Sequence, residues 1–227
     1  MKSDRKYYID NLRCTCILLL IPFHAAMAWN CWGEQNYIWF QSNKSLSAFI
    51  TLLSPWYMPL LFTLAGMSAR YSLQKRAMKD FMKERVKKLL VPFIVGDLTI
   101  VAALAYYADR FHNGYAGGFF AHYKVFLTKY TDLTGYDGGW TPGHLWFVLY
   151  LFLISMAALG VIWVQRRFFP QFSCRNIKMY GIYLLGLFPA IGSLVLDIGG
   201  KSLGMYMALY LIGCVSVYLD RKFPCCT

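Results

Sequence analysis

Six long apolar stretches constrain the fold of this chain more than any other feature. A helix of about 20 apolar residues, rising 1.5 Å per residue, crosses a hydrocarbon core roughly 30 Å thick. The stretches cover residues 14–32, 46–69, 89–108, 144–164, 179–196 and 203–219. Each is predicted to be a helix, because lipid cannot satisfy the backbone groups of an open sheet. The sequence therefore predicts an all-α fold, a transmembrane helix bundle of about six spans.

The composition agrees with a membrane protein. Hydrophobic residues make up 58% of the 227 residues and charged residues only 15%, against roughly 25% in a soluble domain. A net charge of +12 would suggest nucleic acid if it lay on a soluble surface, but the basic residues alternate with apolar stretches. We therefore expect membrane lipid and no nucleic acid as partners. The seven cysteines lack the paired spacing of a metal site, so no metal is expected.

The distribution of lysine and arginine predicts the direction of the spans. Cytoplasmic connections of membrane proteins carry an excess of these residues. Of the 23 in this chain, 18 lie in four segments, residues 1–13, 70–88, 165–178 and 220–227. These segments fall on one side of a six-span arrangement. We expect a multi-pass protein of the cell membrane with both termini in the cytoplasm.

His24 is the clearest candidate for a functional residue, because ionisable groups at membrane depth are costly. Pro22 removes one helical hydrogen bond just before it, a defect tolerated where a helix faces protein or a watery cavity. Arg13 lies eleven residues earlier, which at about 100° per residue places it on the same helix face. Asp10 lies on much the same side. This pattern favours a helix that lines a cavity; the alternative is a structural histidine beside a simple kink.

Asp97 is a second ionisable residue within an apolar stretch. Counted from the cytoplasmic edges, it lies about 12 Å deep and His24 about 15 Å deep. Similar depth allows a pair in which the carboxylate of Asp97 fixes the tautomer of the His24 imidazole. The alternative is that Asp97 hydrogen-bonds a hydroxyl or water as part of helix packing.

A basic run precedes the third stretch, with Lys83, Arg85, Lys87 and Lys88 close together. Arginine can bind phosphate through two parallel hydrogen bonds, so the run is a candidate phosphate clamp at the cytoplasmic end of the helices. The alternative is anchoring alone, because the excess of basic residues on the cytoplasmic side predicts such a cluster without any ligand.

The connection over residues 109–143 is long and rich in glycine and aromatic residues, among them Tyr130 and Trp140. These aromatic side chains either form part of the belt that membrane proteins carry at the lipid–water interface or stack on sugar rings. The sequence leaves both interpretations open.

Four short motifs resemble the membrane-bound acyltransferase 3 family, most closely its branch of glucan-modifying succinyltransferases. That family carries an arginine, ten residues and a histidine in its first span, a spacing that Arg13 and His24 match. It usually carries Arg-x-x-Arg before its third span, so Lys88 departs from the pattern by keeping the charge without the fork geometry. The matching segments are YIDNLR (8–13) with IPFH (21–24), RVKK (85–88) with Pro92, LFTLAG (61–66) and GHLWF (143–147).

The resemblance implies an acyltransferase that moves an acyl group from acyl-CoA to a hydroxyl of a cell-envelope glycan or lipid. Acyl-CoA would be the donor substrate, with no bound cofactor. His24 would act as general base with Arg13 as its catalytic partner, and Arg85 and Lys88 would bind acyl-CoA. The residues expected to support them are Asp10, Asp97, His144 and Trp146.

Members of this family usually have more spans than six. The resemblance therefore implies a single transmembrane acyltransferase-like domain over residues 1–227 that lacks the family's last spans. Two other functions stay open. One is a transporter or flippase for a polysaccharide precursor, with His24 and Asp97 as a proton relay. The other is an inactive, truncated membrane subunit.

Overall fold

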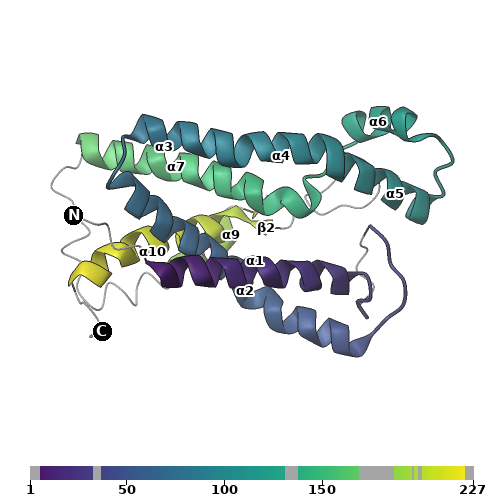
Figure 1. Cartoon of the computed structure of the whole chain (residues 1–227), viewed down its shortest axis with the longest axis horizontal. Coiled ribbons are helices and arrows are strands. Elements are labelled where there is room, and N and C mark those ends of the chain that lie inside the picture. The colour runs from purple at the N-terminus through teal and green to yellow at the C-terminus, as the bar shows by residue number, and fades with distance from the viewer. Residues whose placement is uncertain are drawn as a thin grey trace. The chain divides into compact units, whose positions relative to one another are not determined.

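The computed structural model describes residues 6–32, 37–130, 138–168, 187–195, 197–198 and 201–222, and these residues are mainly helical (Figure 1). The predicted basic segments fall partly outside them, at residues 1–5, 169–178 and 223–227. The predicted all-α class is confirmed. The elements are α1 (Tyr7–Met27), α2 (Lys44–Leu73), α3 (Met78–Arg85), η1 (Val86–Leu90), α4 (Val91–Gly96), η2 (Asp97–Val101), α5 (Ala102–Asn113), α6 (Phe119–Thr128), η3 (Gly143–Leu145), α7 (Trp146–Phe168), α9 (Leu187–Val195), β1 (Asp197–Ile198), β2 (Lys201–Ser202) and α10 (Leu203–Lys222).

Four helices among the described residues are long and apolar enough to cross a membrane. They cover Tyr7–Met27, Lys44–Leu73, Met78–Asn113 and Gly143–Phe168, and they correspond to the first four predicted spans. The sixth predicted span overlaps α10, whose apolar part Leu203–Val217 is shorter. The fifth predicted span, residues 179–196, lies outside the described residues except for α9.

The bounds of α1 differ from those predicted, because a helix can extend into polar residues and can end inside an apolar stretch. The helix α1 begins at Tyr7, seven residues before the apolar stretch, because nothing in the polar segment before Cys14 interrupts a helix. It ends at Met27 rather than Trp32. There the side chain of Asn30 donates to the carbonyl oxygen of Met27 at 2.9 Å, so a turn replaces the last residues of the predicted span.

The long third helix contains two widened turns. Residues Val86–Leu90 (η1) and Asp97–Val101 (η2) have π-helical hydrogen bonding within an otherwise α-helical run. Such turns are rare and occur frequently at functional sites. The first contains the basic residues Lys87 and Lys88, and the second begins at Asp97.

The described chain divides into two compact units. The first unit comprises Met1–Leu61 and Gly96–His144. Within it α1 packs on the first half of α2, where the rings of Phe23 and Tyr57 lie 4.9 Å apart. It also contains α5 and the short helix α6, which the sequence interpretation treated as part of a connection.

The second unit comprises Phe62–Val95 and Leu145–Thr227. Here α3 and η1 lie along α7, and α9 lies along α10 (Figure 1). The second half of α2 meets α10 through glycines: a Cβ on Gly66 would lie 1.9 Å from the carbonyl oxygen of Tyr210, and a Cβ on Gly213 would lie 2.1 Å from that of Thr63. Small residues let helix backbones approach this closely.

Candidate functional site

The first unit brings two histidines together. The imidazole of His24, on α1, meets that of His144, in the turn η3, with ring centroids 4.1 Å apart and planes at 75°. The ring of Tyr37 stacks on the imidazole of His144, with the two centroids 5.0 Å apart and the two planes at 24°. His144 was predicted as a supporting residue. Its pairing with His24 and the involvement of Tyr37 were not predicted, because neither leaves a local pattern in the sequence.

The backbone at Gly143 places the next residue, His144, against His24. It has a positive φ of 49°, a conformation that other residues adopt only with strain. A Cβ at this position would lie 2.0 Å from the hydroxyl oxygen of Tyr37 and 3.4 Å from Cγ1 of Val101. The absence of a side chain at Gly143 therefore allows the tyrosine and the π-helical turn η2 to approach the backbone beside His144.

Asp97 lies in the same unit, at the start of η2, and is 4% exposed. Its Oδ2 accepts a hydrogen bond of 2.8 Å from Nε1 of Trp140. Its Oδ1 is buried without a hydrogen-bond partner among the described residues. The described partner of Asp97 is thus a tryptophan, whereas similar depth had allowed a pair with His24 and left a packing hydrogen bond as the alternative. The described ring neighbours of His24 include His144.

Trp140 is itself fixed from two sides. Its backbone N–H donates to the carbonyl oxygen of Lys129 at 2.6 Å. Its ring stacks on Tyr130, with centroids 5.5 Å apart and planes at 22°. The indole N–H is therefore held in a position that orients the carboxylate of Asp97.

His144 also has a buried polar atom without a described partner, its Nδ1. Native proteins rarely leave buried polar atoms unsatisfied, so such atoms point to a missing partner such as water or a ligand. Trp140 and His144 are the two ends of one five-residue segment. That segment contacts Asp97 at one end and His24 at the other.

Arg13 and Asp10 lie in the first half of α1 and are both half-buried. Because α1 is one continuous helix from Tyr7 to Met27, the spacing of eleven residues places Arg13 and His24 on the same face, as predicted. Pro22 is accommodated inside this helix and is exposed.

The basic residues near the third helix are paired within the second unit. Arg85 lies over the ring of Phe81, 4.6 Å from its centroid. Lys88 is 70% exposed and lies 2.6 Å from Glu84, which also forms an ion pair with Arg76. Glu84 was missed as a member of this cluster, although its position four residues before Lys88 is the usual spacing of a helical ion pair.

Trp146 belongs to the second unit and is buried there. Its ring lies 5.6 Å from that of Tyr206 and 5.4 Å from that of Tyr150. These contacts make it a packing residue of that unit.

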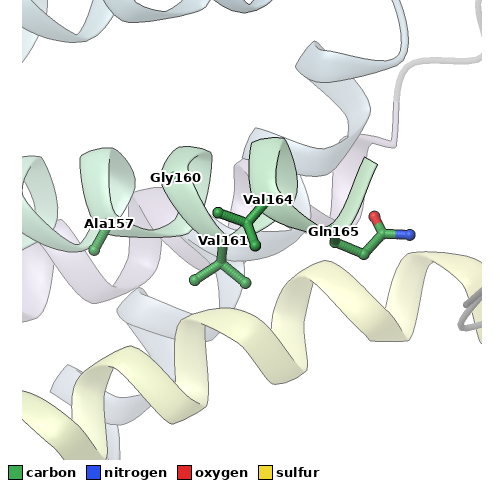
Figure 2. Close-up of a pocket in the computed structure, with 5 residues that line it drawn as sticks. All are labelled: Ala157, Gly160, Val161, Val164 and Gln165. Carbon is green, nitrogen blue, oxygen red and sulfur yellow. The ribbon is translucent and has the colours of Figure 1, made fainter. Parts of the chain in front are cut away.

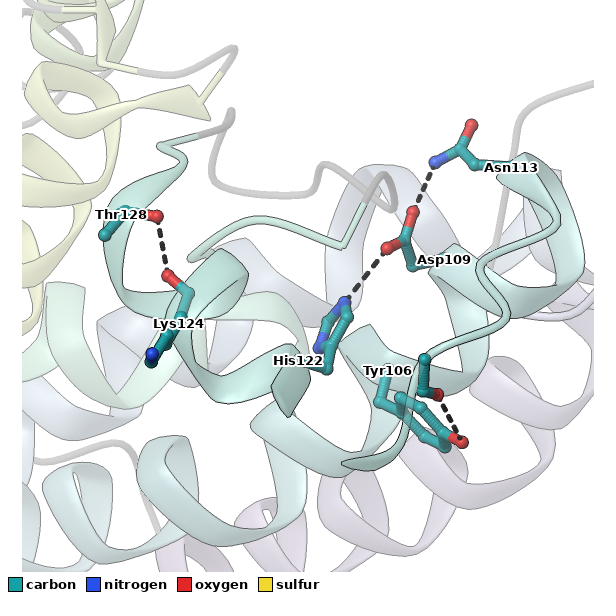
Figure 3. A network of polar contacts seen from close by, with 7 residues as sticks. Tyr106, Asp109, Asn113, His122, Lys124 and Thr128 are labelled. Atoms are coloured by element: carbon teal, nitrogen blue, oxygen red, sulfur yellow. Dashed lines mark hydrogen bonds and ion pairs between the residues drawn. The ribbon is translucent and has the colours of Figure 1, made fainter. Parts of the chain in front are cut away.

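A separate polar cluster joins α5 to α6 in the first unit (Figure 3). Nε2 of His122 lies 3.1 Å from Oδ2 of Asp109, and Asn113 donates to Oδ1 of the same carboxylate at 2.7 Å. Asp109 and His122 are 7% and 1% exposed. A Cβ on Gly138 would lie 2.6 Å from Cγ of Asp109, so the chain before Trp140 packs directly on this carboxylate.

The described residues contain a hollow but no cluster of metal-binding side chains. No group of three or more His, Cys, Asp or Glu side chains suited to a metal ion occurs within the described ranges. A shallow hollow lies on α7 (Figure 2), where Gln165 is the one polar side chain among the five that line it. This lining offers no group for catalysis. The lining residues are Ala157, Gly160, Val161, Val164 and Gln165.

Long apolar helices together with paired imidazoles and a buried carboxylate define a helical membrane protein with a polar site among its helices. Residues 6–223 match the model of the acyltransferase domain that defines the acyltransferase 3 family. The chain belongs to this family.

The chain is also similar to curated proteins named Glucans biosynthesis protein C from Salmonella typhi and Salmonella typhimurium. Each is 23% identical over 174 residues, which cover 73% of this chain and 41% of the relative. The match thus spans about two-fifths of the length of these relatives. No solved structure matches the chain at a significant level.

Proposed function

We propose that this protein is an acyltransferase of the cell membrane that transfers an acyl group from acyl-CoA to a hydroxyl of a cell-envelope glycan or lipid. Membership of the acyltransferase 3 family supports the reaction class. The name of the relatives, Glucans biosynthesis protein C, supports a glycan as acceptor. We further propose six spans with both termini in the cytoplasm, on the distribution of lysine and arginine.

The observation that carries the proposal is the contact of His24 with His144. A general base must be held in one orientation toward the proton that it removes. The edge of His144 against the His24 ring, backed by Tyr37, limits the rotation of that imidazole.

In the proposed reaction the acceptor hydroxyl oxygen attacks the thioester carbonyl carbon while His24 takes the hydroxyl proton. The resulting tetrahedral intermediate breaks its C–S bond, and His24 returns the proton to the sulfur of CoA. The products are an ester and free CoA. Positioned proton transfer of this kind typically contributes about 10² to 10⁴ in rate.

Arg85 and Lys88 are proposed to bind the phosphates of acyl-CoA on the cytoplasmic side. Lys88 is exposed and its ion pair with Glu84 lies at the surface, so a phosphate can replace the carboxylate at little cost. Arg13 is proposed to lie along the path of the thioester, on the same helix face as His24.

The proposal is tested with membranes that contain the full chain, labelled acetyl-CoA or succinyl-CoA, and measurement of label in the envelope fraction. His24→Ala should abolish transfer while the protein still inserts into the membrane. His112→Ala, which changes a histidine near the end of α5, is the matched control and should retain activity. An active His24→Ala protein would refute the role of His24.

Both other functions predict no acyl transfer by the chain alone, and two further measurements separate them. A transporter would move its cargo without consuming acyl-CoA and would depend on a proton gradient. An inactive subunit would show no transfer alone and would recover activity only with a partner chain.

A further inference from the structure

We propose that Asp97, oriented by Trp140, binds a second hydroxyl of the acceptor, so that the site selects a pyranose with neighbouring free hydroxyls over an alcohol with a single hydroxyl. This inference rests on the proposed function and narrows it. The proposed function admits a glycan or a lipid as acceptor. A second hydroxyl-binding group favours an acceptor with more than one free hydroxyl, which a sugar has.

The first step of the argument is the unused oxygen of Asp97. The side chain is 4% exposed, Oδ2 accepts from Trp140, and Oδ1 has no described partner. A buried carboxylate oxygen without a donor is costly, and the cost is removed when a ligand supplies an O–H. The acceptor hydroxyls of a sugar are such donors, because each can donate one hydrogen bond to a carboxylate.

The second step is the fixed orientation of this carboxylate. The indole N–H of Trp140 is held by the backbone bond to Lys129 and by the stacked ring of Tyr130. Because Oδ2 is occupied by this donor, Oδ1 is the atom left to a ligand. Side chains locked by their own contacts are what a specific binding site requires.

The third step is the position of this group relative to the base. The segment from Trp140 to His144 contacts Asp97 at its first residue and His24 at its last. Gly143, between them, leaves room for the hydroxyl of Tyr37 against the backbone. All of these residues belong to the first unit. The inference is that one acceptor presents one hydroxyl to His24 and another to Asp97.

The chemistry of the surroundings favours a sugar. The carboxylate disfavours a negatively charged acceptor, and Trp140 and Tyr130 are aromatic rings of the kind that pack on pyranose rings. A simple alcohol would leave Oδ1 unsatisfied. A site built to hydrogen-bond a hydroxyl discriminates strongly against analogues that lack it.

The test is ligand-observed NMR binding to the purified full chain in lipid nanodiscs. The probes are methyl glucopyranoside, its monodeoxy analogues that each lack one ring hydroxyl, and cyclohexanol, a ring of similar size with one hydroxyl. In Asp97→Asn the amide oxygen takes the hydrogen bond of Trp140, which turns the NH₂ group toward the ligand. We expect this variant to bind methyl glucopyranoside at least about tenfold more weakly than the wild type.

The monodeoxy series makes the test specific. One analogue lacks the hydroxyl that binds Asp97. The wild type should bind this analogue as weakly as Asp97→Asn binds methyl glucopyranoside. Asp97→Asn should bind this analogue with the same affinity as the wild type does. Cyclohexanol should bind both proteins equally. Trp140→Phe, which keeps a ring and loses the N–H, should show the same analogue dependence with a smaller loss, and it serves as the second variant if Asp97→Asn does not fold.

Equal affinity of the wild type and Asp97→Asn for methyl glucopyranoside would overturn the inference, and so would no binding of this sugar by the wild type. The inference would also fail if Asp97→Asn lost the same affinity for every monodeoxy analogue. The binding measurement needs no acyl-CoA. Sugar binding that depends on Asp97 without acyl transfer would therefore refute the proposed reaction alone, whereas transfer that is insensitive to Asp97 would refute this inference alone.

Discussion

The cluster of Asp109 and His122 predicts that one substitution will release the helix α6. In His122→Leu the apolar side chain fills much of the space of the imidazole, but Oδ2 of Asp109 loses its partner at 3.1 Å. The carboxylate stays buried, because the backbone of Gly138 packs on it and Asp109 is 7% exposed. Breaking a buried pair from one side costs about 3 to 5 kcal/mol. Asn113 still donates to Oδ1, so we expect about 3 kcal/mol.

This loss should appear as local opening, because His122 is the buried polar anchor of a helix of only 10 residues. A loss of 3 kcal/mol corresponds to roughly 100-fold faster amide exchange when exchange follows the opening equilibrium. The assay is hydrogen–deuterium exchange of peptides from α6, measured by mass spectrometry with the protein in nanodiscs.

The matched control is Asn113→Ala, which removes one hydrogen bond from an exposed residue and keeps the His122 pair. It should change the free energy of opening by about 1 kcal/mol or less. Exchange in His122→Leu within threefold of the wild type would refute the reasoning, and so would an equally large effect of Asn113→Ala.

Three further changes test other parts of the structure. Gly66→Leu should lower the free energy of unfolding by about 3 kcal/mol, because its Cβ would meet a backbone carbonyl of α10. The variant should elute as aggregated protein in size-exclusion chromatography. Gly160→Leu is the control and should be tolerated, because no atom lies within 4 Å of a Cβ at that position. His144→Gln should lower the rate of acyl transfer by about 10-fold to 100-fold, because it removes the ring that limits the rotation of His24, and the labelled acyl-CoA assay measures the loss. Glu84→Gln should lower the KM for acyl-CoA up to about fivefold at low salt, because it frees Lys88 from its ion pair. An unchanged KM would remove Lys88 from the donor site.

The helices were predictable because lipid leaves a long apolar segment only one regular structure. Hydrophobicity alone misplaced their ends, as in α1, since a helix continues through polar residues until a turn or a cap ends it. The helix α6 was not predicted because its aromatic residues, such as Phe119 and Phe126, fit an interfacial connection equally well. The π-helical turn at Asp97 also interrupts the period of 3.6 residues on which face assignments depend.

Candidate residues could be named from the sequence, but their contacts could not. The cost of ionisable groups in lipid singled out His24 and Asp97, and that argument needs no knowledge of neighbours. Their partners depend on tertiary structure: Trp140 reaches Asp97 through a backbone bridge to Lys129, and His144 reaches His24 through the left-handed Gly143. Nothing local in a sequence encodes such contacts.

The contact between the two imidazoles can form only after the ribosome has added the second histidine. His24 and His144 are 120 positions apart in the chain, so at about 5–20 residues per second the ribosome adds the second roughly 6 to 24 seconds after the first. During that interval the first helix enters the bilayer with a polar side chain whose eventual neighbour does not yet exist. A product that stops before residue 144 would lack this ring neighbour of His24, a polar group that is costly at membrane depth.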